Sequence, residues 1–476
     1  WYKNSRAGIE QGFELKERPH AKSKGELVLV GEVKTDLAVL NPTREKIGFS
    51  KSGAEVVQYA GLKVVDATGK TLPSWLSYSA KGKLKQLLIH IDDSQAVYPL
   101  LVDPLATSPS WTGEANQDSA NYGISVSTAG DVNGDGFSDV LVGAWNYANG
   151  EANEGRAYLY LGSASGLATT AAWTGEGNQI SAKYGISVST AGDVNGDGYS
   201  DVVVGAQQYD NGSPDEGQAY VYLGSASGLS TTAAWTGESN QDLAFYGRSV
   251  STAGDVNGDG YSDVVVGAFY YDNGESEEGQ AYLYLGSPLG LGTTAAWTGE
   301  GDQFSALYGA SVSTAGDVNG DGFSDVLVGA YNYSNGETTE GKAYLYLGSG
   351  SGLATTAAWT GESNQGGGSF GYSVSTAGDV NKDGYSDVVV GAVLESNGEN
   401  AEGRAYLYLG SASGLATTAA WTGEPNQSQA YYGNSVSTAG DVNGDGYSDV
   451  VVGAYNYANG ENAEGQAYLY LGSPLG

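Results

Sequence analysis

The stretch from Ser125 to Ala144 reads Ser-Val-Ser-Thr-Ala-Gly-Asp-Val-Asn-Gly-Asp-Gly-Phe-Ser-Asp-Val-Leu-Val-Gly-Ala and recurs, with small changes, five more times in the 476-residue chain. It belongs to a longer unit of 62 residues. Self-similarity at a fixed period is the signature of a repeat architecture, so the period decides the fold class before any local pattern is considered. Each unit opens with Trp-Thr-Gly-Glu, at Trp111, Trp173, Trp235, Trp297, Trp359 and Trp421.

Each unit is made of short apolar runs bounded by glycine, which favour β-strands and are too short for helices. In the first unit we expect strands near 124–129, 140–143, 156–161 and 171–175. Four strands per unit predict an all-β fold, a β-propeller of four-stranded blades, because radial closure leaves few exposed sheet edges. A β-solenoid is the alternative, but its turns are shorter, about 20–30 residues.

The three phrases Tyr-Gly-x-Ser-Val, Asp-x-Asn-x-Asp-Gly-x-x-Asp and Val-Gly-Ala resemble the FG-GAP repeat of integrin α-chain propellers and of many secreted bacterial proteins. The resemblance covers 111–476. Integrin propellers have seven blades, whereas this chain shows six units. Residues 110–113 form a fourth strand without its first three, and the last unit ends after its third strand. We therefore expect these two to pair and close a six-bladed ring; a missing seventh blade or strand exchange with another molecule are the alternatives.

Between the first and second strands of every unit lies the loop Asp-x-Asn-x-Asp-Gly-Phe/Tyr-x-Asp. Ca²⁺ takes 6–8 oxygen ligands, and alternate positions of a tight loop can turn their oxygens inward. We expect the side chains at positions 1, 3, 5 and 9 and the carbonyl at position 7 to bind about six structural Ca²⁺ ions. A metal-free turn is the alternative, disfavoured because the carboxylates would repel one another. The predicted ligands are Asp131, Asn133, Asp135, Phe137, Asp139, Asp193, Asn195, Asp197, Tyr199, Asp201, Asp255, Asn257, Asp259, Tyr261, Asp263, Asp317, Asn319, Asp321, Phe323, Asp325, Asp379, Asn381, Asp383, Tyr385, Asp387, Asp441, Asn443, Asp445, Tyr447 and Asp449.

The six copies differ mainly in two loops, one after Trp-Thr-Gly-Glu and one after Val-Gly-Ala. A four-stranded blade places both on the face opposite the calcium loops, and the resemblance implies that ligands bind there. Aromatic side chains on loops suit protein or glycan recognition, while packing between blades is the alternative. The candidate ligand residues are Trp145, Tyr147, Gln207, Tyr209, Phe269, Tyr271, Tyr331, Tyr333, Tyr455 and Tyr457.

The charge of the chain changes abruptly before the repeats begin. Residues 1–110 hold 15 basic and 12 acidic residues, whereas 111–476 hold 6 and 43. Together with short alternating apolar runs in the first part, this step predicts a small β-sandwich-like domain over 1–107 and the propeller over 108–476. We interpret both histidines, His20 and His90, as structural, because no partner for nucleophilic catalysis lies near either in the sequence.

The composition also limits the function. A net charge of −34 disfavours nucleic-acid binding, and no apolar run is long enough to span a membrane. Sixfold repetition disfavours an enzyme, because an active site needs one asymmetric constellation. We interpret the chain as an extracellular or cell-surface calcium-binding propeller for adhesion, protein interaction or assembly. The alternative is the non-catalytic propeller module of a larger secreted hydrolase, carbohydrate-active or phospholipase-like.

Overall fold

The computed structural model describes residues 2–5, 8–11, 13–18, 26–35, 37–40, 42–44, 46–51, 54–60, 62–67, 70–81, 84–104, 111–164, 166–459, 461–474 and 476. Within these ranges every helix or strand assigned is a β-strand, so the all-β prediction is confirmed. The chain divides into two compact units. The first comprises Trp1–Gly113 and Ala164–Thr169, and the second comprises Glu114–Ser163 and Thr170–Gly476.

The first unit consists of small antiparallel sheets around one apolar core. The core includes Ile47, Leu76, Ile89 and Val102, which come from three of the sheets. The sheets are β1-β2, β4-β10-β9, β3-β11-β8 and β5-β6-β7. The strands are β1 (Tyr2–Ser5), β2 (Gly8–Gln11), β3 (Phe13–Leu15), β4 (Glu26–Glu32), β5 (Ala38–Leu40), β6 (Lys46–Lys51), β7 (Ala54–Ala60), β8 (Leu62–Asp66), β9 (Ser74–Lys81), β10 (Leu84–Asp92) and β11 (Leu100–Pro104).

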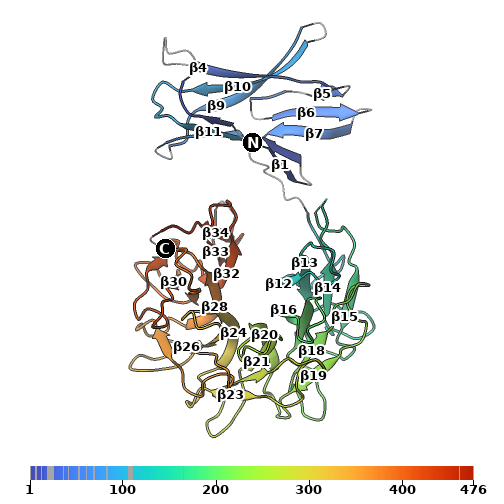
Figure 1. Cartoon of the computed structure of the whole chain (residues 1–476), viewed down its shortest axis with the longest axis vertical. Coiled ribbons are helices and arrows are strands. Elements are labelled where there is room, and N and C mark those ends of the chain that lie inside the picture. Colours follow the sequence, from blue (N-terminus) through green and yellow to red (C-terminus); the bar gives the residue numbers. More distant parts are fainter. Residues whose placement is uncertain are drawn as a thin grey trace. The chain divides into compact units, whose positions relative to one another are not determined.

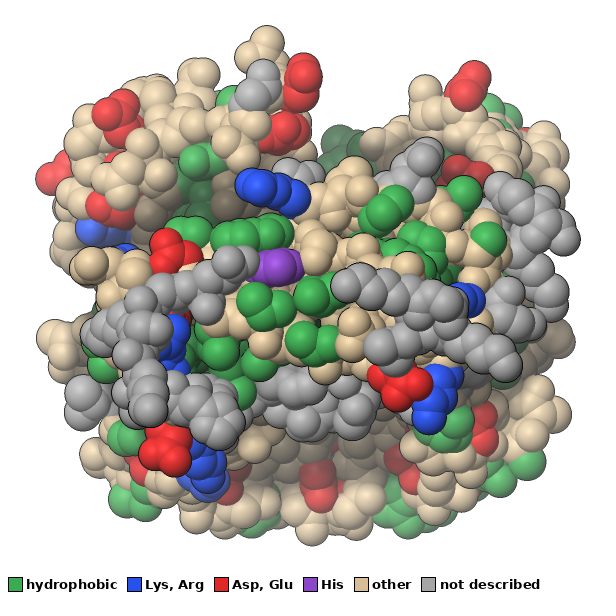
Figure 2. Space-filling model, turned by 90° about the horizontal axis from the view of Figure 1, so that it is seen from above, with side chains coloured by type: hydrophobic (Ala, Val, Ile, Leu, Met, Phe, Trp, Pro, Cys, Tyr) green, Lys and Arg blue, Asp and Glu red, His purple; other side chains and the backbone are tan. Residues whose placement is uncertain are grey.

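The outer face of the β4-β10-β9 sheet holds one of the two histidines. His90 stacks on Trp75, with ring centroids 5.1 Å apart, and its Nε2 lies 2.7 Å from Ser77 Oγ. Val28, its cross-strand neighbour on β4, is partly exposed, and Figure 2 shows hydrophobic side chains gathered on this face. His90 thus takes part in stacking and hydrogen bonding, as the sequence predicts. His20 lies outside the described residues.

Each repeat of the second unit builds one antiparallel blade. In blade 1 the sheet order is β12 (Tyr122–Gly130), β13 (Asp139–Ala144), β14 (Arg156–Tyr160) and β15 (Trp173–Glu176), so the four predicted strands are confirmed. Blade 6 has three strands. The remaining strands are β16 (Tyr184–Gly192), β17 (Asp201–Ala206), β18 (Gln218–Tyr222) and β19 (Trp235–Glu238) in blade 2; β20 (Tyr246–Gly254), β21 (Asp263–Ala268), β22 (Gln280–Tyr284) and β23 (Trp297–Glu300) in blade 3; β24 (Tyr308–Gly316), β25 (Asp325–Ala330), β26 (Lys342–Tyr346) and β27 (Trp359–Glu362) in blade 4; β28 (Phe370–Gly378), β29 (Asp387–Ala392), β30 (Arg404–Tyr408) and β31 (Trp421–Gly423) in blade 5; and β32 (Tyr432–Gly440), β33 (Asp449–Ala454) and β34 (Gln466–Tyr470) in blade 6.

The apolar cores lie between successive blades, so blades 2 to 5 are buried on both faces. Leu159 and Trp173 of blade 1 pack against Tyr184, Val188 and Val204 of blade 2 in one cluster, and the same arrangement recurs down the propeller. Strands buried on two faces read as continuous apolar runs, which explains the repeated Asp-Val-Val-Val-Gly-Ala phrase.

Two glycines of each repeat allow the blades to approach backbone to backbone. A Cβ on Gly143 of blade 1 would collide with the carbonyl oxygen of Gly185 in blade 2. Ser125 Oγ donates a hydrogen bond to that same carbonyl at 2.9 Å. The Gly of Val-Gly-Ala and the Gly of Tyr-Gly are therefore required by contact between neighbouring blades rather than by chain flexibility.

The six blades form an arc whose two ends are blade 1 (β12–β15) and blade 6 (β32–β34), as Figure 1 shows. Val126 of blade 1 is 62% exposed, whereas Val188, at the same position of blade 2, is 7% exposed. The prediction that the Trp111 strand closes the ring is wrong: the sheet of blade 6 contains only β32, β33 and β34. Trp111 Nε1 instead donates to the Ala168 carbonyl at 2.8 Å, just as Trp173 Nε1 donates to Ser230.

The free end of blade 1 predicts unequal effects of one substitution at two equivalent positions. Val188→Ala removes two buried methyl groups and should lower the free energy of unfolding by about 2 kcal/mol. Val126→Ala should change it by less than about 0.5 kcal/mol. Chemical denaturation of the two variants measures the difference. Equal losses would show that the face of blade 1 is covered in solution.

Candidate metal loops and loop face

In the loop between the first two strands of each blade, side-chain oxygens accept hydrogen bonds from the loop's own backbone N–H groups. In blade 2, Asp193 Oδ1 accepts hydrogen bonds from the backbone N–H groups of Gly196 and Asp197 at 2.7 and 3.1 Å, and its Oδ2 accepts one from Gly198 at 2.8 Å. Asp197 Oδ1 accepts from the backbone N–H of Tyr199 at 3.1 Å. Gly198 has φ of +89°, the left-handed region that favours glycine.

Position 3 of the same loop is held inside the turn. Asn195 Oδ1 accepts from the backbone N–H of Asp197 at 3.0 Å, and its Nδ2 donates to Asp197 Oδ2 at 2.9 Å. The side chains at positions 1, 3 and 5 are therefore gathered over one turn. Their oxygens, with the backbone carbonyl at position 7, are the hard neutral and anionic donors that suit Ca²⁺.

The aspartate at position 9 has a different environment. Asp201 is fully buried, and its Oδ2 and Oδ1 accept hydrogen bonds from the backbone N–H groups of Val194 and Gly224 at 2.9 and 2.8 Å. Burial raises the pKa of Asp201 to about 7; the two N–H groups oppose this shift, while Asp193 and Asp197 reinforce it. Within the described residues no three His, Cys, Asp or Glu side chains converge on one point, because this carboxylate turns toward the interior.

Basic side chains of the propeller do not neutralise these loops. Each of its six basic residues lies over an aromatic ring, and the ion pairs in the described part of the propeller join Arg156 and Arg404 to Glu176, Glu395 and Glu424. Apart from Lys382, which belongs to the fifth loop and lies against Gly446 of the sixth, no basic side chain in the described part of the propeller compensates the carboxylates of the Asp loops, and a bound cation would do so.

The predicted ligand face divides into two classes of residue. The tyrosines at the third loop position are half-buried and pack edge-on against a tyrosine of the third strand; in blade 2 the rings of Tyr209 and Tyr220 are 6.2 Å apart at 88°. The same contact holds Tyr147, Tyr271, Tyr333 and Tyr457.

The residues at the first loop position contact neighbouring loops instead. Lys183 Nζ lies 4.6 Å from the ring centre of Trp145, Tyr331 contacts Tyr372, and Phe269 is 5.8 Å from Phe245. Tyr455 stacks on Tyr431 at 5.2 Å and is 57% exposed, while Gln207 is half-buried. Trp145, Phe269 and Tyr331 are likewise half-buried, so Tyr455 is the most exposed residue of the predicted ligand face.

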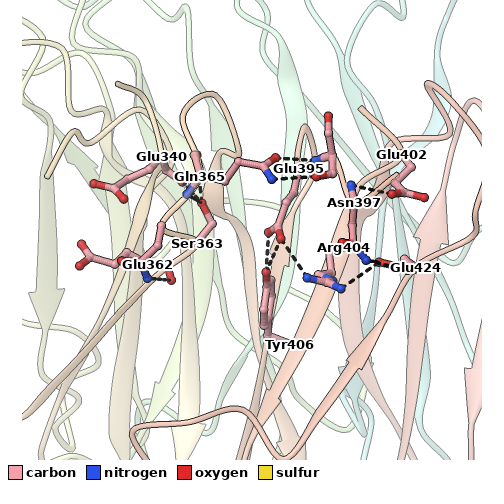
Figure 3. Close-up of polar contacts among 12 residues, drawn as sticks. Glu340, Glu362, Ser363, Gln365, Glu395, Asn397, Glu402, Arg404, Tyr406 and Glu424 are labelled. Atoms are coloured by element: carbon pink, nitrogen blue, oxygen red, sulfur yellow. Dashed lines mark hydrogen bonds and ion pairs between the residues drawn. The ribbon is translucent and has the colours of Figure 1, made fainter. Parts of the chain in front are cut away.

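Residues that repeat in every blade support these loops. Glu402 is buried and its Oε1 accepts from the backbone N–H of Asn397 at 2.7 Å, while Asn397 Nδ2 donates to Glu424 (Figure 3). Gln365 forms two hydrogen bonds with the backbone of Ser396, at 2.7 and 2.6 Å. These contacts fasten the two loops of each blade together, so the invariant glutamates satisfy backbone donors.

Blade 5 departs from the sixfold pattern at Glu395, a buried residue that replaces the half-buried tyrosine of the other blades. Tyr406 Oη donates to both of its carboxylate oxygens, at 2.6 and 2.5 Å, and Arg404 Nη1 lies 3.2 Å away (Figure 3). Burial raises the pKa of Glu395, and the hydrogen bond from Tyr406 and the charge of Arg404 partly oppose that shift. The aligned repeats reveal the substitution, but its burial could not be read from the sequence.

The comparisons with known proteins agree with this architecture. A family model described as "FG-GAP repeat" matches residues 122–160, 184–222, 246–284, 308–346, 370–408 and 432–470. The chain contains six FG-GAP repeats. These ranges run from the first through the third strand of each blade, so every FG-GAP repeat includes one complete Asp loop.

Three of the proteins to which this chain is similar are integrin α-chains. Integrin alpha-V of Gallus gallus is 33% identical over 249 residues, which cover 50% of this chain and 22% of that protein. Integrin alpha-PS2 of Drosophila melanogaster is 32% identical over 240 residues (47% and 16%), and integrin alpha-8 of Gallus gallus is 33% identical over 219 residues (44% and 20%). The matches thus span about a fifth of these relatives. The described residues include no helix suited to crossing a membrane.

Replacing Glu395 is predicted to raise the stability of the protein by an amount that depends on pH. Because its folded-state pKa is raised, Glu395 lowers the free energy of unfolding at high pH, and this penalty disappears as pH falls through the folded pKa toward the unfolded one. Glu395→Tyr, which restores the residue of the other blades, should therefore raise Tm more at pH 8 than at pH 5. Glu399→Gln, an exposed control in the same loop, should show no such difference. An equal shift at both pH values would contradict the assignment.

Proposed function

We propose that this chain is an extracellular, calcium-binding propeller that acts in adhesion or protein–protein interaction, or as a subunit of a cell-surface assembly. The observation that carries the proposal is the sixfold Asp loop, whose gathered oxygens have no basic counter-charge in the first four copies. It occurs in FG-GAP repeats similar to those of integrin α-chains, which the comparisons name. The propeller is proposed as a binding module rather than an enzyme.

Each loop is proposed to hold one structural Ca²⁺ ion. In blade 2 the donors would be the side chains of Asp193, Asn195 and Asp197 and the carbonyl of Tyr199, with Asp201 the fifth residue of the predicted set. Bound Ca²⁺ would supply positive charge between carboxylates that repel one another. The chain itself supplies the turn, through hydrogen bonds from the loop N–H groups to Asp193 and Asp197.

The partner is proposed to be a protein or glycan that binds the loop face. Trp145, Phe269, Tyr331 and Tyr455 begin the loops after the second strands of four blades, and Tyr455 is the most exposed of them. Large aromatic side chains with few rotatable bonds provide contact area at a low entropic cost. An extracellular or cell-surface location fits loops of this kind, because millimolar free Ca²⁺ can saturate even weak sites.

Removing calcium should destabilise the protein. EDTA is expected to lower Tm and added Ca²⁺ to restore it, because a ligand at about 100 times its Kd contributes about 2.7 kcal/mol per site. Mg²⁺ should restore less, since it rarely occupies all-protein cages. Asp193→Asn should reduce the Ca²⁺-dependent shift, whereas Asp118→Asn, an exposed residue outside the loops, should not. A melting curve unaffected by EDTA would contradict the metal assignment.

Binding through the loop face can be tested with immobilised matrix proteins and glycans. The chain is expected to bind a member of such a panel in Ca²⁺, and Tyr455→Ala should weaken that binding at least tenfold, as for an aromatic contact at the centre of an interface. Leu289→Ala is the control, because Leu289 is 97% exposed and lies in a loop between third and fourth strands. Equal affinity of the two variants would exclude the face around Tyr455.

A further inference from the structure

Each Asp loop is held by the blade that follows it. In the second loop, the backbone N–H of Ser262 in blade 3 donates to the carbonyl of Asp193 at 2.9 Å. The backbone N–H of Asp193 donates in turn to Ser262 Oγ at 3.2 Å. Both main-chain polar groups of the first predicted ligand are thus bonded to the neighbouring blade, and they orient the residue whose carboxylate would meet the ion.

Two further contacts complete this clasp. The backbone N–H of Ser287, after the third strand of blade 3, donates to the Val194 carbonyl at 3.0 Å. Gly196, at position 4 of the loop, lies against the ring of Tyr261, where a Cβ would collide. The loop therefore contacts the next blade at positions 1, 2 and 4.

The backbone bond from the serine at position 8 of the next loop recurs in five loops, and the contact of a position-4 glycine with the next aromatic ring recurs in the first four. The five bonds run from the backbone N–H of Ser200, Ser262, Ser324, Ser386 and Ser448 to the carbonyls of Asp131, Asp193, Asp255, Asp317 and Asp379, at 2.9–3.0 Å.

One asymmetry concerns the sixth loop, Asp441–Asp449. Lys382 stands at position 4 of the fifth loop, where the other loops have glycine, and its φ is +61°. Its ammonium group lies against Gly446 and 5.5 Å from the ring centre of Tyr447, both in the sixth loop. A fixed positive charge beside this loop opposes the binding of a cation there.

We propose that Ser200, Ser262, Ser324, Ser386 and Ser448 are positioning residues for the metal loops. This inference rests on the proposed calcium function. Each serine pre-orders the loop of the preceding blade, so cation binding there loses less conformational entropy and strengthens the contact between the two blades. The first five sites are coupled to their blade interfaces, whereas the sixth, next to the ammonium group of Lys382, binds Ca²⁺ most weakly.

Calcium binding to the full chain after EDTA treatment tests this division. Isothermal titration calorimetry with CaCl₂ should resolve five tighter sites and one that is about tenfold weaker, within the usual range of coupling between sites. Asp441→Asn should delete only the weak class, and Lys382→Gly should tighten it. Six identical, independent sites would overturn the inference and leave the proposed function intact. Absence of any Ca²⁺ binding would overturn both.

The clasp itself is tested by a serine substitution under two conditions. Ser262→Ala removes the acceptor of the Asp193 N–H, and its loss of Tm should be larger in saturating Ca²⁺ than in EDTA, because the clasp and the ion support each other. Ser251→Ala is the matched control: its Oγ donates to the nearby Thr252 carbonyl at 2.9 Å within the same blade. Equal losses in Ca²⁺ and EDTA would show a purely structural serine and overturn the coupling.

Discussion

Every blade depends on the hydrogen bonds that a buried carboxylate at the ninth position of its Asp loop accepts. Asp201 receives N–H groups from the start of its own loop and from Gly224, which follows the third strand, and it opens the second strand itself. Charged hydrogen bonds of this kind are strong, and losing the carboxylate would leave two buried donors unsatisfied. One side chain thereby joins three strands to the loop that carries the candidate metal ligands.

The sixfold repetition separates structural residues from those free to vary. Positions that face a neighbouring blade, such as Gly143 and Ser125, repeat because each interface is a copy of the last. Stability in such an array is close to a sum of blade and interface contributions. The departures, Glu395 and Lys382, are therefore informative: the first places a buried acid where the other blades have tyrosine, and the second places a charge beside a neighbouring loop.

The charge distribution follows the same logic. The propeller has 43 acidic and six basic residues, and the basic ones are engaged with aromatic rings; Arg156, for example, lies 4.2 Å from the ring centre of Tyr147. Of the six, Lys382 alone lies beside Asp loops, so the Asp-rich face is left largely without compensation. Inorganic cations should stabilise a protein of this composition more when its acidic loops are already ordered before the cations bind.

The sequence by itself determined the period, the four strands per blade and the Asp loops, because repeated local patterns report residues that are neighbours along the chain. Tertiary structure alone decided the rest. The clasp joins Asp193 to Ser262, 69 residues away, and the inward turn of Asp201 depends on Gly224. The open arc is likewise decided by the tertiary structure, in which Trp111 Nε1 donates to the Ala168 carbonyl and the last sheet contains only β32, β33 and β34. Contacts between blades depend on how the sheets stack, which no single repeat encodes.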